Sequence, residues 1–114
     1  MGVASPTFIQ AAATAAWSED EHVIERRQLF SAKRQLLIDG LEQRGIEVCP
    51  SDAGLYIWAK VPNGLSSDAY AEQCLEKGIV ISPGGFFGNG GEGYFRVALV
   101  PSIDDCKAAL AQWV

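Results

Sequence analysis

The sequence contains little of what metal sites and disulfide frameworks are built from. Its 114 residues include one histidine, His22, and three widely spaced cysteines, Cys49, Cys74 and Cys106. A zinc site needs closer ligands or more histidine, and a secreted disulfide scaffold normally has an even number of cysteines. We therefore expect no metal site, and we expect the cysteines to be small buried or half-buried side chains. Their number alone leaves open a cysteine nucleophile served by His22.

Positive charge and long apolar runs are also scarce. Nine lysines and arginines against 14 acidic residues give a formal net charge of −5. That balance argues against a protein that binds nucleic acid or an anionic membrane. No apolar run is long enough to span a bilayer, and no basic segment followed by an apolar one opens the chain. With 48% hydrophobic residues, the composition predicts one globular, cytoplasmic domain.

Capping residues, glycines and prolines divide the chain into eight expected elements, in the order α-α-β-β-α-β-β-α. The third helix is expected to be capped by Ser67 or Asp68. The expected helices cover residues 7–17, 18–44, 67–78 and 102–114, and the expected strands cover residues 46–48, 55–61, 79–81 and 94–100.

Two segments match the capping-box pattern, in which a serine and an acidic residue three positions later satisfy the first backbone N–H groups of a helix. Ser18-x-x-Glu21 is expected to begin a long helix that runs to Arg44. Ser102-x-x-Asp105 is expected to begin the last helix. This element order predicts an α+β fold, in which a long helix precedes a small, mainly antiparallel sheet with helices packed on one face.

Aliphatic and aromatic side chains alternate along the two strongest strand candidates, so they are expected on opposite faces of the sheet. If helices cover the aliphatic set, an aromatic face around one arginine remains, which suggests that a ligand or another domain covers it. The aliphatic set is Leu55, Ile57, Ala59, Val61, Phe95, Val97 and Leu99, and the opposite set is Tyr56, Trp58, Lys60, Tyr94, Arg96 and Ala98.

Arg96 is the strongest candidate for a binding residue. It lies mid-strand in the apolar run Phe95-Arg96-Val97. A guanidinium in that setting needs an anionic partner, and its planar fork suits a carboxylate or phosphate bound by two parallel hydrogen bonds. The alternative is a structural ion pair with Glu92 or Asp52.

Among the other cationic residues, the lysines are expected to face solvent, and the arginines are expected mostly to do so. No lysine lies in a setting that would desolvate it enough to act as a Schiff-base amine. The arginines in this group are Arg26, Arg27, Arg34 and Arg44 on the long helix, and the lysines are Lys33, Lys60, Lys77 and Lys107.

A glycine-rich loop covers residues 83–93. Its Gly88-x-Gly90-x-x-Gly93 segment matches a dinucleotide-binding fingerprint in letters only, because that motif must open a helix and here it precedes a strand. One interpretation is a mobile loop that needs positive φ angles. The other is a flexible segment beside a ligand site, with Phe86 and Phe87 as apolar walls.

Three segments, residues 54–58, 77–84 and 87–99, resemble the C-terminal domain of pyridoxal-phosphate-dependent aminotransferases of the aspartate aminotransferase family. Residues 4–12 resemble the stretch before the long interdomain helix of that family, for which residues 18–44 are the match. The resemblance covers essentially all of residues 1–114, in order. Within the family, the pattern is most similar to bacterial N-succinyldiaminopimelate aminotransferases of lysine biosynthesis.

The resemblance implies roles for five residues. Arg96 matches the arginine that binds the α-carboxylate of the substrate. Gly54 and Tyr56 match a Gly-x-aromatic segment at the edge of the substrate pocket. Phe86 and Phe87 match the loop that moves with the small domain when substrate binds.

The resemblance also implies pyridoxal phosphate as the cofactor of the parent enzyme, with amino-acid and 2-oxo-acid substrates, and a homodimeric parent. One implied substrate pair is N-succinyl-LL-2,6-diaminopimelate with glutamate or 2-oxoglutarate. In this family the lysine bound to the cofactor lies in a large domain upstream in the same polypeptide, and nothing here matches its motif. This chain alone is therefore expected to be inactive and to bind no cofactor.

Two hypotheses of other classes remain. The chain is an autonomous carboxylate-binding module without catalysis, or it is a structural or oligomerisation domain. In the second case the face that carries Tyr56, Trp58 and Tyr94 is a protein interface.

Overall fold

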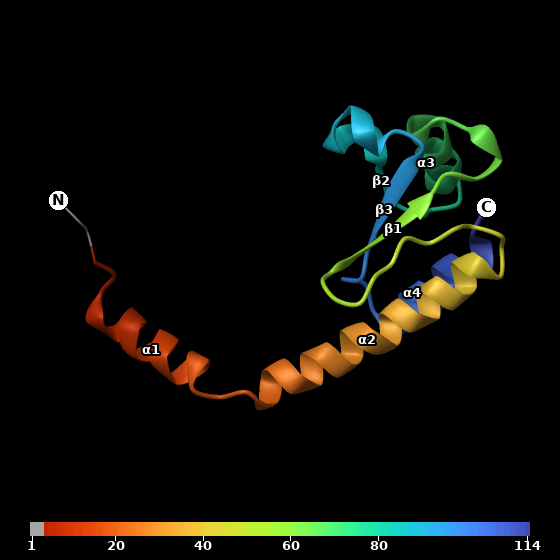
Figure 1. Ribbon diagram of the computed structural model, residues 1–114. Coiled ribbons are helices and arrows are strands. Elements are labelled where there is room, and N and C mark those ends of the chain that lie inside the picture. Colours follow the sequence, from red (N-terminus) through yellow and green to blue (C-terminus); the bar gives the residue numbers. More distant parts are fainter. Residues whose placement is uncertain (1–3) are drawn as a thin grey trace.

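The structure is a computed structural model and describes residues 4–114. Within that range it confirms the α+β class, with helices and a three-stranded antiparallel sheet in the strand order β1-β3-β2 (Figure 1). The helices are α1 (Thr7–Trp17), α2 (Glu21–Glu42), α3 (Ser67–Glu76) and α4 (Ile103–Gln112), and the strands are β1 (Tyr56–Lys60), β2 (Ser82–Pro83) and β3 (Tyr94–Ala98). Short 3-10 turns are η1 (Pro62–Gly64), η2 (Gly84–Phe87) and η3 (Asn89–Gly91).

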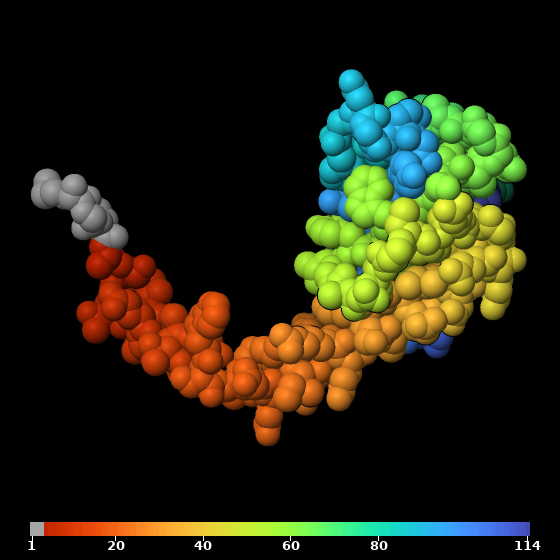
Figure 2. All heavy atoms as spheres, viewed as in Figure 1, coloured from red at the N-terminus to blue at the C-terminus, as the bar shows by residue number. Residues whose placement is uncertain are grey.

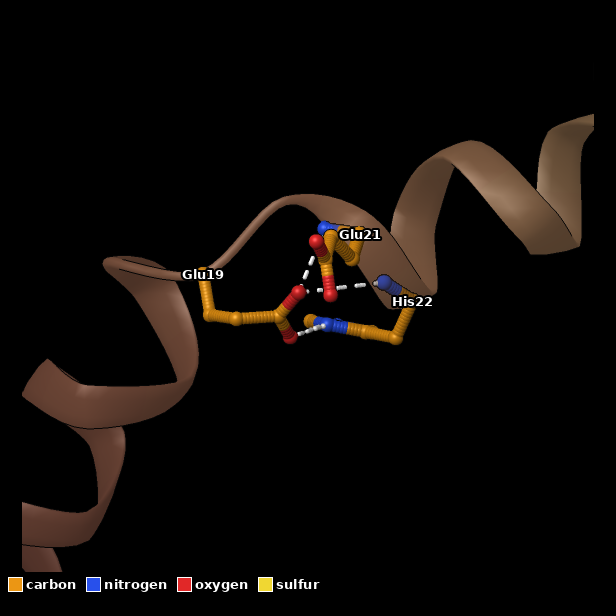
Figure 3. A network of polar contacts seen from close by, with 3 residues as sticks. All are labelled: Glu19, Glu21 and His22. Atoms are coloured by element: carbon orange, nitrogen blue, oxygen red, sulfur yellow. Dashed lines mark hydrogen bonds and ion pairs between the residues drawn. The ribbon is translucent and has the colours of Figure 1, made fainter.

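The junction between α1 and α2 differs from the predicted capping box. The Ser18 hydroxyl donates to the carbonyl of Thr14 at 2.7 Å, so this serine ends α1 instead of starting α2. The Glu19 carboxylate instead accepts hydrogen bonds from the backbone N–H groups of Glu21 and His22, and it also contacts His22 Nδ1 (Figure 3). Hydrogen bonding to the charged form, from the His22 side chain first, lowers the pKa of Glu19. A single carboxylate thus satisfies two of the free amides that begin α2.

The predicted end of α2 at Arg44 is two residues too late. The helix ends at Glu42, and Gly45 follows with φ of 76°, a left-handed conformation that commonly closes a helix. The backbone N–H of Ile46 then donates to the carbonyl of Leu41 at 3.1 Å, which satisfies one of the last free carbonyls.

Two predicted strands are not formed as expected. Residues 46–48 contribute only an isolated bridge between Val48 and Ala59. Residues 79–81 are not a strand, because Gly78 has φ of 76° and the N–H of Ile79 donates to Cys74 at the end of α3, at 2.9 Å. The short strand β2 follows at Ser82 instead. An apolar run of three residues indicates burial, but periodicity alone does not decide its backbone partner.

The helices cover one face of the sheet, as predicted. The aliphatic face of β1 and β3 joins the inward side chains of α2, α3 and α4 in one core, while Leu55, before β1, is exposed. As expected for the cysteines, Cys74 and Cys106 are buried and Cys49 is half-buried. The core consists of Leu37, Leu41, Ile46, Ile57, Ala59, Tyr70, Cys74, Ile79, Ile81, Phe95, Val97, Leu99, Cys106 and Leu110.

The first helix, α1, stands apart from this core. It has no buried residue, and Figure 2 shows it in red, projecting from the body that contains the sheet. Phe8 and Trp17 are 75% and 89% exposed. None of the helices within residues 4–114 combines the length and apolar character that crossing a membrane requires.

The contact between α2 and α4 depends on Gly40. A Cβ atom at this position would lie 2.5 Å from Cδ2 of Leu110. That is shorter than any van der Waals contact, so the missing side chain lets the two helices approach.

We expect Gly40→Ala to lower the free energy of unfolding by about 1–3 kcal/mol through overpacking, although alanine normally favours a helix by about 1 kcal/mol over glycine. In a Leu110→Ala background the same change should be neutral or stabilising, because the space is then free. Urea denaturation of the wild type, the two single variants and the double variant measures the coupling energy between the two positions. Additive effects of the two substitutions would contradict the contact.

The predicted capping box of α4 is confirmed. The Ser102 hydroxyl accepts from the N–H of Asp105 at 3.1 Å, and the Asp105 carboxylate accepts from the N–H of Ser102 at 3.2 Å and from its hydroxyl at 2.7 Å. The side-chain bond from Ser102, followed by the backbone bond, lowers the pKa of Asp105 below its usual 3.8.

A carboxylate whose pKa is lower in the folded state stabilises the fold above its unfolded pKa, and this contribution is lost as the pH falls through the folded value. We therefore expect Asp105→Asn to reduce stability at neutral pH and to converge with the wild type as the pH falls below the lowered pKa of Asp105. Urea midpoints across the acid range measure this. As a control, Asp104→Asn in the same helical turn should leave the acid limb nearly unchanged, since its carboxylate contacts only Lys107, at 3.5 Å.

Candidate functional site

The face of the sheet opposite the core carries the predicted aromatic set. Trp58 of β1 lies directly across from Arg96 of β3, and Tyr56 and Tyr94 lie at the neighbouring positions of the same face. This placement follows from the two-residue period of the strands, because Ile57 and Phe95 between them are fully buried.

The Arg96 guanidinium contacts two aromatic rings. Its Cζ atom lies 4.0 Å from the ring centroid of Tyr56 and 4.4 Å from that of Phe87. Both distances are those of cation–π contacts. The Phe87 ring is in turn held edge-on by Trp58, with centroids 5.3 Å apart, and Trp58 contacts Tyr94 in the same manner at 6.5 Å. The rings thus restrain the orientation of the guanidinium.

No carboxylate among residues 4–114 forms an ion pair with Arg96. Neither of the two acids considered as structural partners does so: the Glu92 carboxylate bonds to Ser67, and Asp52 lies in a depression beside α2. Within the same range, no residue forms a hydrogen bond with the Arg96 side chain. Its N–H donors are therefore available to an anion from outside this part of the chain.

An open pocket of about 550 Å³ lies beside this arginine. Its lining includes Tyr56 and Phe87, both of which contact Arg96, and contains no acidic or basic side chain. A guanidinium next to an aromatic, uncharged pocket suits a small molecule with a carboxylate and an apolar portion. The lining residues are Cys49, Pro50, Ser51, Ala53, Tyr56, Trp58, Phe87, Gly90, Gly91 and Tyr94.

Phe87 reaches Arg96 because the glycine-rich loop is folded tightly on itself. The turns η2 and η3 pack backbone against backbone, so that a Cβ atom on Gly84 would lie 1.9 Å from the carbonyl oxygen of Gly91. Between the two turns, Gly88 has φ of 107°, which a residue with a side chain rarely adopts. These positions require glycine, and the loop has a definite conformation beside the pocket.

The structure brings together three of the five site residues implied by the resemblance: Arg96, Tyr56 and Phe87. Phe86 is 77% exposed and lines a separate depression with residues of α3. Gly54 precedes β1 with φ of 87°, and its carbonyl accepts a hydrogen bond from Nη2 of Arg34 on α2.

The prediction that Lys33 of α2 faces solvent is wrong, and Arg34 is an exception among the arginines expected mostly to face solvent. Lys33 is 3% exposed, and its Nζ atom donates to the carbonyl of Pro101 at 2.8 Å. Arg34 is 9% exposed. The sequence did contain a signal, because Lys33 lies four residues before the buried Leu37 and therefore on the same side of the helix.

The four lysines do not face the pocket, whose lining contains none of them. Lys33 is held by backbone carbonyls, Lys60 is exposed and bonds to Glu47 at 2.7 Å, and Lys77 and Lys107 are exposed. The bond to Glu47 raises the pKa of Lys60, so its amine is held further in the charged, non-nucleophilic form. No lysine is placed to form a covalent bond with a molecule in this pocket.

The sequence and the fold both resemble known proteins. A profile of the family described as "Aminotransferase class I and II" matches residues 1–112. An LL-diaminopimelate aminotransferase from Maridesulfovibrio salexigens is 37% identical over 106 residues, which make up 91% of this chain and 27% of that protein.

Two solved structures are similar in fold. An aromatic aminotransferase from Pyrococcus horikoshii matches with a TM-score of 0.87 and 28% identity, over 93% of this chain and 30% of that one. A probable N-succinyldiaminopimelate aminotransferase from Thermus thermophilus matches with a TM-score of 0.78 and 25% identity, over 87% of this chain and 27% of that one. The chain therefore spans less than a third of the length of the proteins that it matches.

We expect Gly84→Ala to unfold or rearrange the glycine-rich loop, at a cost of about 1–3 kcal/mol or more, because backbone atoms on both sides leave no room for a methyl group. Gly90→Ala in the same loop is the matched control, since its Cβ atom would meet nothing within 4 Å. Urea denaturation compares the two. Equal midpoints for both variants would contradict the close approach of η2 and η3.

Proposed function

The chain belongs to the class I and II aminotransferase family, and on that premise we propose that it forms the substrate-carboxylate-binding small domain of a pyridoxal-phosphate-dependent aminotransferase. The observation that carries this proposal is the guanidinium of Arg96. It lies against the rings of Tyr56 and Phe87, and no acid within residues 4–114 neutralises it.

Binding of a carboxylate by Arg96 follows from the chemistry of the two groups. A guanidinium presents parallel N–H donors in one plane, and a carboxylate presents two oxygens at a matching separation. The aromatic rings restrain the guanidinium before the substrate arrives, which reduces the entropy lost on binding. The uncharged pocket beside it accepts an apolar portion of the substrate. In this arrangement the chain binds and orients an amino acid or a 2-oxo acid.

The names of the relatives support a narrower substrate class. The sequence relative from Maridesulfovibrio salexigens is named for LL-diaminopimelate, and the structure from Thermus thermophilus for N-succinyldiaminopimelate. We therefore propose that the parent enzyme acts in lysine biosynthesis on a substrate of the diaminopimelate class, as amino donor or as product. The other substrate pair is then glutamate and 2-oxoglutarate.

Members of this family use pyridoxal phosphate, which stabilises a substrate carbanion as an electron sink. The pocket of this chain does not fit the cofactor by itself, since its lining has no lysine for a covalent bond and no cationic side chain for a phosphate. We propose that a large domain of the same polypeptide, in a homodimeric enzyme, supplies those groups. The chain alone should show no transamination.

We expect Arg96→Lys in the complete enzyme to lower kcat/KM for LL-diaminopimelate by about 10- to 100-fold, because one compact ammonium replaces two parallel hydrogen bonds. Steady-state transamination with 2-oxoglutarate measures this. N-succinyl-LL-diaminopimelate in the same assay distinguishes the two proposed donors.

Lys60→Gln is the matched control for Arg96→Lys. Lys60 is a cation of β1 on the sheet face that carries Arg96, but it is paired with Glu47. Its removal should therefore change kcat/KM by less than about twofold. Unchanged kinetics in Arg96→Lys would refute the proposed role and favour the alternative that this face is a protein interface. Turnover by the purified 114-residue chain would refute the need for a large domain.

A further inference from the structure

Hydrogen bonds tie both ends of the glycine-rich loop to the start of α3. The Glu92 carboxylate accepts from the backbone N–H of Ser67 at 2.8 Å and from its hydroxyl at 2.7 Å. The Ser67 hydroxyl also accepts from the backbone N–H of Gly85 at 3.3 Å. Because Gly85 lies near the start of the loop and Glu92 lies near its end, one serine connects the two. We call this set of contacts the Ser67–Glu92 bridge.

The Ser67–Glu92 bridge occupies a position that the sequence pattern assigns to a helix cap. Ser67 was a predicted cap of α3, but the cap is Ser66, whose hydroxyl accepts from the N–H of Ala69 at 3.2 Å. Ser67 is instead fully buried at the first helical position. Its N–H is one of the free amides of a helix start, where the helix dipole favours a negative charge.

The bridge binds the charged form of Glu92. The backbone bond from Ser67, followed by its side-chain bond, lowers the pKa of the Glu92 carboxyl. The loop packs directly on the bridge, since a Cβ atom on Gly85 would lie 3.1 Å from Oε2 of Glu92 and 3.4 Å from Oγ of Ser67. From Gly85 the turn η2 leads within two residues to Phe87, whose ring contacts Arg96.

We propose that Ser67 and Glu92 are positioning residues for the carboxylate site: by fixing the glycine-rich loop to α3, they hold the Phe87 ring against the Arg96 guanidinium. This inference rests on the proposed function of Arg96. Within residues 4–114, neither residue forms a hydrogen bond or an ion pair with Arg96. Their effect on substrate is therefore transmitted by the loop.

The test measures KM and kcat for LL-diaminopimelate in the complete enzyme. Glu92→Gln and Ser67→Ala should each raise KM about three- to tenfold, the range expected when a cation–π contact is loosened, with kcat changed less than twofold. Because Glu92 is exposed, Glu92→Gln leaves the core intact and keeps the test available if Ser67→Ala, at a fully buried position, does not fold.

The matched control is Asp105→Asn, which removes a carboxylate from the equivalent serine–carboxylate pair at the start of α4. A purely structural role for Glu92 would give the same pattern as this control: a lower urea midpoint and an unchanged KM. A positioning role for the Ser67–Glu92 bridge predicts a raised KM for Glu92→Gln and an unchanged KM for Asp105→Asn.

A double substitution tests whether the effect passes through Phe87. In a Phe87→Leu background, Glu92→Gln should raise KM no further, because the ring that the bridge positions is already absent. A crystal structure of Glu92→Gln gives a readout without activity. A Phe87 ring still about 4.4 Å from Cζ of Arg96 would overturn the inference.

Failure of this inference is distinguishable from failure of the proposed function. If Arg96→Lys lowers kcat/KM while Glu92→Gln and Ser67→Ala behave like the wild type, the bridge has no positioning role and the carboxylate site stands. If Arg96→Lys itself leaves the kinetics unchanged, the site is refuted, and the inference with it.

Discussion

The alternation of side chains along β1 and β3 is the constraint on which both the core and the candidate site depend. Neighbouring residues of a strand point to opposite faces, so Phe95 is buried under the helices and Arg96 lies on the opposite face. There the guanidinium lies against the rings of Tyr56 and Phe87. A shift of pairing by one residue would place the guanidinium in the core and the phenyl ring in solvent. The free energy gained by burying Ile57 and Phe95 therefore also fixes the register that presents Arg96 beside Tyr56.

The parts of the site that the sequence predicts are those set by this local period. The positions of Tyr56 and Arg96 on one face follow from counting residues along two strands. Phe86 and Phe87 are equivalent in any such count, and only the folded loop decides which ring reaches the arginine. The role of Ser67 was hidden for a similar reason, because its acceptor lies 25 residues away in sequence.

The same division holds for the fold. The class of the fold and the bounds of α1 are predicted correctly from sequence patterns that extend over a few residues. Some errors occur where a distant acceptor decides the outcome: Lys33 is buried where carbonyls 67 and 68 residues away accept hydrogen bonds from its ammonium. Others occur where local partners compete: residues 79–81 are not part of the sheet, and the N–H of Ile79 donates to the carbonyl of Cys74 near the end of α3.

The long helix α2 connects the sheet domain to the distant helix α1. Its C-terminal half packs on the sheet domain through α4, while its N-terminal end carries α1, which touches none of the core (Figure 1). At the usual rise per residue, its 22 residues span about 33 Å. A rotation of the sheet domain by about 10° around the packed end would displace the far end by roughly 6 Å. Small angular changes at the core are thus amplified into large translations at the other end of the helix.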